Sequence, residues 1–143
     1  MKNTGGFLIT RIKQVGGRVF DRILSQKKID VFNGAQGRIL YVLWQDNGVP
    51  ISELSRQTGL ATTTLTSMLD RMETTGLIYR DRGDKDRRKI RIYLTEKAKG
   101  LEEDYNSVSE EMSRIYYKGF SDQEIEQLES YLERILINVE EEL

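Results

Sequence analysis

The stretch from Thr62 to Thr95 places hydroxyl side chains next to closely spaced basic side chains. It begins TTTLTSMLDRMETTG, typical of a short helix with hydroxyls at its start, and continues LIYRDRGDKDRRKIRIYLT. The start of a helix favours a phosphate, and short hydroxyl side chains can approach base edges and thymine methyl groups. Basic side chains on a hairpin can reach phosphates or the minor groove. The pattern therefore predicts recognition of duplex DNA.

Catalysis is a poor fit to the composition. The chain has no histidine and no cysteine, which removes the commonest general base, thiolate chemistry and disulfides. It has no GxGxxG or P-loop pattern. The carboxylates at 102–104 and 140–142 occur in runs typical of solvent-facing helix. We expect no enzyme activity, no cofactor and no metal.

The hydroxyls are expected on the outer face of one helix. Its predicted buried stripe is Leu65, Met68, Leu69 and Met72, which leaves Thr63, Thr64, Ser67 and Arg71 facing outward. Thr62 by itself could be only an N-cap. The run of three threonines exceeds what capping needs, so we interpret the outward set as DNA contacts.

The basic residues are expected on a hairpin with strands at 77–82 and 90–94 and a tip at 83–89. Asp86 could orient the guanidinium of Arg88 for the minor groove. The neighbouring basic side chains predicted to contact DNA are Arg80, Arg82, Arg87 and Lys89. An ordinary solvated hairpin would carry similar charge, and this alternative stays open.

The rest of the chain is expected to be helical. The first helix should span Thr4 to Gln26, and a capping box of Asn33 and Gln36 should start the second. Ser52 should cap a short helix that ends at Gly59, with only a tight turn before the next helix, as in a helix-turn-helix. Thr95 should cap a long helix that extends to about residue 118. A capping box formed by Ser121 and Glu124 should start the last helix.

Charge is distributed unevenly over the 143 residues, whose net charge is −1. Residues 1–61 carry +5, residues 62–95 carry +3 and residues 96–143 carry −9. A polyanion would be attracted to the first two thirds, although acidic residues also coat ordinary solvent-facing helices. The N-terminal stretch has Arg11 and Lys13 within its only apolar run, so we expect no signal peptide, no membrane span and a cytoplasmic location.

The whole arrangement resembles the MarR family of bacterial transcriptional regulators. The resemblance lies in Asp86-Arg87-Arg88 at the tip of the hairpin, which is called the wing in this family, and in the strand end Leu94-Thr95. It also lies in the order of the elements upstream: a short helix, a helix that begins with Ser or Thr, and a glycine. It implies a mainly α fold with a small β-hairpin, forming one domain over 1–143. That domain would have a winged-helix lobe at about 33–95 and dimerisation helices at about 4–28 and 96–143.

The resemblance also implies partners. These are a pseudo-palindromic double-stranded DNA operator, a second copy of the chain, and a small aromatic or phenolic acid that releases DNA. An effector crevice could be lined by Phe20, Tyr41, Trp44, Tyr116 and Tyr117, with Arg11 or Arg18 near a carboxylate. Such aromatics are often ordinary core. The expected function is a dimeric repressor, and the alternative is a winged-helix protein–protein adaptor without DNA binding.

Overall fold

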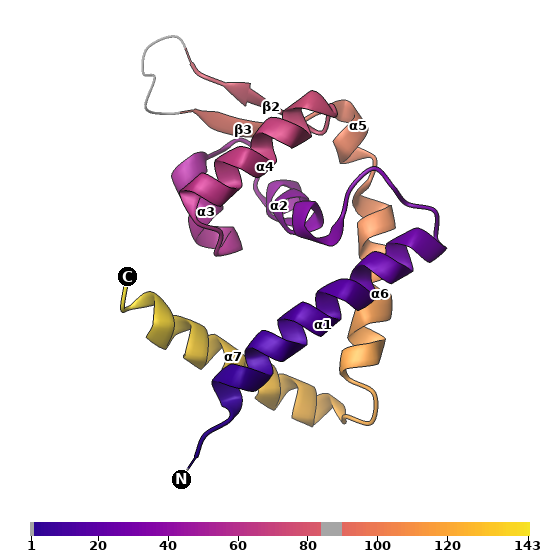
Figure 1. The fold of residues 1–143 in the computed structure, drawn as a ribbon, viewed down its shortest axis with the longest axis vertical. Coiled ribbons are helices and arrows are strands. Elements are labelled where there is room, and N and C mark those ends of the chain that lie inside the picture. Colours follow the sequence, from indigo (N-terminus) through magenta and orange to yellow (C-terminus); the bar gives the residue numbers. More distant parts are fainter. Residues whose placement is uncertain (1, 84–89) are drawn as a thin grey trace. The chain divides into compact units, whose positions relative to one another are not determined.

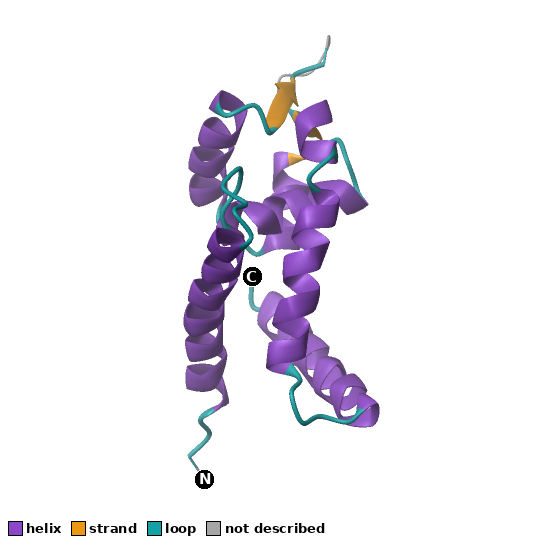
Figure 2. Ribbon diagram, turned by 90° about the vertical axis from the view of Figure 1, so that its right-hand side faces the viewer, coloured by secondary structure: helices purple, strands orange, loops and turns teal. Residues whose placement is uncertain are grey.

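The computed structural model describes residues 2–83 and 90–143, which form two compact units, Met1–Ser109 and Glu110–Leu143. Helices dominate both units, and the few strands are short (Figures 1 and 2). In chain order the elements are α1 Gly5–Gln26, α2 Gly34–Gln45, β1 Val49–Pro50, α3 Ile51–Thr58, α4 Thr62–Thr74, β2 Ile78–Asp81, β3 Arg91–Leu94, α5 Glu96–Lys99, α6 Glu102–Tyr116 and α7 Asp122–Glu140.

Helix α2 supplies the centre of the first unit. The predicted capping box is confirmed, because the Asn33 side chain accepts from the backbone N–H of Gln36 at 2.8 Å and the Gln36 side chain accepts from the backbone N–H of Asn33 at 3.1 Å. Ile39, Leu40 and Leu43 are fully buried, as their spacing predicts. α2 packs against α1, α3 and β3, so it forms the base on which the following elements are placed.

The sheet has three antiparallel strands in the order β1-β3-β2, one more than the sequence predicts. Val49 of β1 pairs with Ile92, and Ile78 of β2 pairs with Leu94. β1 is only two residues long and includes the proline at 50. A strand that short, with a proline, has no recognisable alternation, which is why the sequence does not reveal it.

Two local predictions were wrong. Ser52 does not cap α3, because the helix already begins at Ile51, directly after Pro50. The single long helix expected after Thr95 is two helices, separated around Gly100. Thr95 itself does cap α5, accepting from the N–H of Ala98 at 3.2 Å. Beside the interruption, the Ala98 carbonyl accepts from the indole N–H of Trp44 at 3.0 Å and from the backbone N–H of Leu101 at 3.1 Å.

The second unit ends in α7, whose predicted capping box at Ser121 and Glu124 is confirmed. This 19-residue helix has no buried residue, although it carries a stripe of large apolar side chains. No helix in the described part of the chain is long and apolar enough to cross a membrane.

Candidate nucleic-acid interface

Helix α4 begins without a side-chain cap. Ala61 is the N-cap residue, and its side chain makes no hydrogen bond to the first-turn N–H groups. Thr62 is therefore the first helical residue and not the cap considered from the sequence. Backbone N–H groups at such a start are suited to bind a phosphate oxygen.

One exposed face of α4 carries the predicted hydroxyl and basic side chains. A shallow concavity of about 370 Å³ is lined by Thr63, Thr64, Ser67, Met68 and Arg71. The opposite face is held in the core, since Leu65, Leu69 and Met72 are fully buried. Met68, predicted to be buried, is only partly covered and belongs to the outer surface. The burial of the inner face therefore fixes which side chains α4 can present to a ligand.

Short polar contacts fix the turn between α3 and α4. Gly59 ends α3, as predicted, and has a φ of 75°, the left-handed conformation common at helix ends. The hydroxyl of Ser55 donates to the Leu60 carbonyl at 2.5 Å, and the Leu60 N–H donates to the Thr58 hydroxyl at 3.2 Å. These bonds satisfy the backbone of the turn, so α4 follows α3 at a defined angle, as in a helix-turn-helix.

The hairpin strands β2 and β3 follow α4. Ile92 and Leu94 face the core, being 0% and 3% exposed, as their alternation predicts. On the other side, the rings of Tyr79 and Tyr93 stack with their centroids 5.4 Å apart. Arg82 is exposed just beyond β2. The predicted contacts Asp86, Arg87, Arg88 and Lys89 lie outside the described residues.

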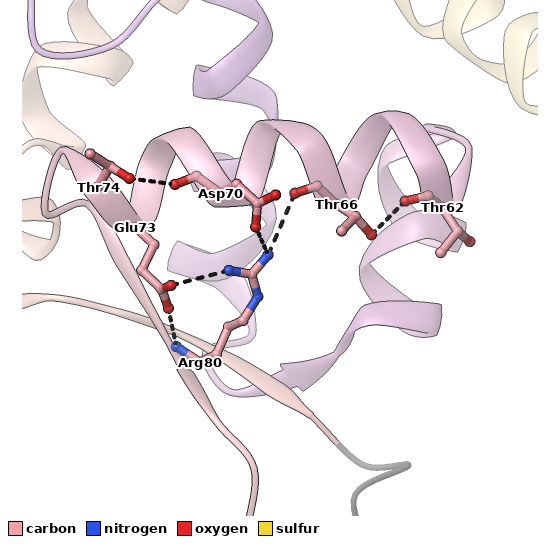
Figure 3. A network of polar contacts seen from close by, with 6 residues as sticks. All are labelled: Thr62, Thr66, Asp70, Glu73, Thr74 and Arg80. Atoms are coloured by element: carbon pink, nitrogen blue, oxygen red, sulfur yellow. Dashed lines mark hydrogen bonds and ion pairs between the residues drawn. The ribbon is translucent and has the colours of Figure 1, made fainter.

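Arg80 has a different environment from the one expected. Its guanidinium contacts Asp70 at 2.8 Å and Glu73 at 3.2 Å, and it also lies 3.5 Å from the Thr66 carbonyl (Figure 3). Its side chain is only 13% exposed. That Arg80 contacts phosphates stays a prediction, and in this structure its Nη1 and Nη2 atoms face acceptors of α4.

Three of the predicted effector residues meet around the ring of Tyr105, which the sequence does not single out. Phe20, Tyr41 and Trp44 each lie with their ring centroids 5.3–5.8 Å from that of Tyr105, and Phe32 lies at 6.3 Å. Burial raises the pKa of the Tyr105 hydroxyl, and Tyr41 adds to the shift. Tyr116, also predicted there, belongs to the second unit. No local feature of the sequence sets Tyr105 apart.

Sequence comparisons identify relatives of known class. Residues 32–90 match the profile of the MarR family. The transcriptional regulator MgrA of Staphylococcus aureus is 26% identical over 121 residues, which cover 83% of this chain and 81% of MgrA. The transcriptional regulator TtmR of Methylorubrum extorquens is 33% identical over 85 residues, or 59% of this chain. That alignment covers 42% of TtmR, so the chain spans less than half of that relative's length.

A solved structure confirms the fold. The structure of the S. aureus MepR–DNA complex matches with a TM-score of 0.82 and 26% identity, covering 96% of this chain and 99% of that one. The predicted fold class, mainly α with a small winged sheet, is therefore correct.

Proposed function

We propose that this chain, which belongs to the MarR family of transcriptional regulators, is a dimeric repressor that binds a pseudo-palindromic DNA operator. It is a regulator and not an enzyme, since its relatives are regulators. One observation carries the proposal: α4 buries its apolar face and turns Thr63, Thr64, Ser67 and Arg71 outward around one concavity. In the proposed complex this face enters the major groove, and the uncapped first turn at Thr62 meets a phosphate.

The hairpin would supply the second contact. Arg88 would enter the minor groove, Asp86 would orient it, and Arg82, Arg87 and Lys89 would meet phosphates. The resemblance to the family supports these roles. The fold supports them in one respect, because β2 packs on α4 and so brings the hairpin next to the helix that would read the bases.

A second copy of the chain would complete the protein. One recognition helix reads only a few base pairs, and a two-fold dimer doubles the contacts over half-sites about one helical turn apart. We propose that residues 1–143 act as one such domain, with the lobe at about 33–95 and dimerisation helices at about 4–28 and 96–143. A DNA-binding role is also in keeping with the expected cytoplasmic location.

The aromatic side chains around Tyr105 would form part of an effector site. In this proposal Phe20, Tyr41 and Trp44 offer their rings to a small aromatic or phenolic acid. Such a ligand would release DNA by binding better to a dimer whose recognition helices are wrongly spaced for the operator.

The test is selection of bound duplexes from a random DNA pool, followed by affinity measurements at several salt concentrations. We expect a two-fold consensus and an affinity that falls steeply as salt rises. The Arg88→Ala variant should bind more weakly while it keeps its fold and dimer mass. A protein that selects no duplex, while it remains folded and captures a protein partner, would instead be the adaptor.

A further inference from the structure

Arg80 joins the hairpin to the helix that carries the proposed base contacts. It lies on β2, and its partners Asp70, Glu73 and Thr66 all lie on α4 (Figure 3). Besides the side-chain contacts, the backbone N–H of Arg80 donates to the Glu73 carboxylate at 3.3 Å. One residue of the hairpin is thus tied to three positions spread over two turns of the helix.

We propose that Arg80 is a positioning residue that fixes the hairpin relative to α4, so that both contact one operator in register. This inference rests on the proposed function. In that function α4 reads the major groove and the hairpin contacts the adjacent minor groove. The placement of the hairpin relative to α4 therefore decides whether both sets of contacts form. Functional contacts of this kind need placement to within about 0.5 Å.

The geometry favours a structural link over a phosphate contact. A planar guanidinium can bridge two carboxylates and a carbonyl at once, which a lysine ammonium on its flexible stem cannot reproduce in the same geometry. To reach a phosphate, Arg80 would have to leave Asp70 and Glu73, whose side chains are 67% and 45% exposed. Two unpaired carboxylates would then remain on the helix that faces the polyanion. Arg80 therefore also neutralises negative charge on α4.

The decisive variant is Arg80→Lys, which keeps the positive charge but loses the planar set of guanidinium N–H donors. Its control is Arg56→Lys, the same change at an arginine whose carboxylate partner, Glu53, lies on the same helix, α3. We expect Arg80→Lys to lose about tenfold in operator affinity. Its affinity for an unrelated duplex and its salt dependence should stay at the parent's values, because non-specific binding depends on phosphate neutralisation. Arg56→Lys should bind both duplexes nearly as the parent does, since the pair of Arg56 with Glu53 lies within α3 and does not join the hairpin to α4.

Two results would overturn the positioning role. One is operator binding by Arg80→Lys at the parent's affinity. The other is an equal loss for operator and unrelated duplex with a shallower salt dependence, the behaviour of a phosphate contact. Asp70→Asn gives an independent check should Arg80→Lys fold poorly. Positioning predicts a loss of operator preference, whereas a phosphate contact predicts tighter binding to both duplexes once Arg80 is released.

Amide hydrogen exchange of the free protein separates this inference from the proposed function. We expect faster exchange at residues 78–81 in Arg80→Lys than in the parent or in Arg56→Lys, with α2 unchanged. Unchanged exchange at 78–81 would show that Arg80 does not hold the hairpin to α4, whatever the protein binds. A parent that binds no duplex, with faster exchange in the variant, would overturn the proposed function and leave the mechanical link in place.

Discussion

The hydroxyls of α4 fall into two groups according to what surrounds them. Thr66 and Thr74 donate to the carbonyls of Thr62 and Asp70, one turn earlier in the helix, at 2.8 and 3.0 Å. Ser67 instead lies on the concavity with Thr63 and Thr64. The helix thus uses some hydroxyls for its own backbone and presents others at the surface, and only the second group is suited to read bases.

Ser67→Ala should therefore weaken operator binding without affecting the fold. The loss of one hydrogen bond corresponds to about 1 kcal/mol, or roughly fivefold in affinity. Fluorescence anisotropy with the selected operator and an unrelated duplex would measure it, and only the operator should be affected. Thr74→Ala, on the same helix but bonded within it, serves as the control. An equal loss in both variants would assign the effect to the helix and not to base contact.

The phenol of Tyr117 makes stability depend on pH in the alkaline range. Its hydroxyl donates to the Glu129 carboxylate at 2.6 Å, and this bond raises the pKa of Tyr117 from 10.0 to about 12. The folded state thus holds the proton more tightly than the unfolded state does. The contribution is complete below pH 10 and is lost as the pH rises through about 12.

Tyr117→Phe removes this dependence. We expect the free energy of unfolding of the parent to fall, relative to that of the variant, between pH 10 and pH 12. The side chain is only partly buried, so the difference should be small. Urea unfolding at several pH values would measure it, and parallel pH curves for the two proteins would contradict the assignment.

At the residue scale, the sequence predicted side chains whose role depends on local spacing. The outward set Thr63, Thr64, Ser67 and Arg71 follows from helical periodicity, and the structure places it together. The partners of Arg80 did not follow, because Asp70 and Glu73 precede a glycine turn whose path the sequence does not define. Tyr105 was missed for a similar reason, since its four aromatic neighbours come from the first 44 residues of the chain.

Among the elements, the turn before β1 depends on one glycine. Gly48 has a φ of 81°, and a Cβ there would lie 2.6 Å from the Tyr93 ring. Gly59 has a φ of 75° with nothing within 4 Å of such a Cβ. The two positions share the same backbone demand and differ in the space around them.

Gly48→Ala should therefore destabilise more than Gly59→Ala. We expect about 1–2 kcal/mol for the left-handed alanine at 59 and a larger loss at 48, where the stacked tyrosine must also move. Chemical denaturation of the two variants and the parent would measure both costs. Equal losses would mean that the Tyr93 ring yields freely and that the sheet does not depend on this contact.

Element ends were predictable where their cause is local. The capping boxes at Asn33 and Ser121 and the stop at Gly59 each depend on residues within one turn. The strand β1 and the break between α5 and α6 were not predictable. β1 exists only because β3 pairs with it, and the break involves a hydrogen bond from Trp44, 54 positions away from Ala98.

At the scale of the whole molecule, each of the two units has an exposed apolar helix face. On α1 the exposed side chains are Phe7, Leu8, Ile9, Ile12 and Val15, and on α7 they are Tyr131, Leu132, Ile135, Leu136, Ile137 and Val139. The apolar residues of α7 at 125, 128, 132, 135 and 139 repeat every three or four positions, a spacing typical of a helix that packs on another helix. An apolar surface of this extent is typical of a protein–protein interface.

Leu136→Glu tests whether a second copy covers α7. Leu136 is 57% exposed in the single chain, and burying a leucine contributes about 2 kcal/mol. A two-fold interface contains the substitution twice, so we expect the dimer dissociation constant to rise by at least about a hundredfold. Sedimentation velocity over a range of concentrations would measure it. Ser130→Glu adds the same charge on the side of α7 away from Leu132, Leu136 and Val139, and it should leave the constant unchanged.

The same variant connects assembly to DNA recognition. A Leu136→Glu monomer keeps an intact α4 and hairpin, so it should still bind a single half-site weakly. It should lose the gain that the parent shows when two half-sites are joined one helical turn apart, because that gain requires the two recognition helices to be linked. The affinities of the parent and the variant for duplexes with one and with two half-sites would separate half-site binding from the gain that dimerisation gives. A variant that is monomeric yet retains the full two-site gain would show that the dimer forms on DNA through another surface.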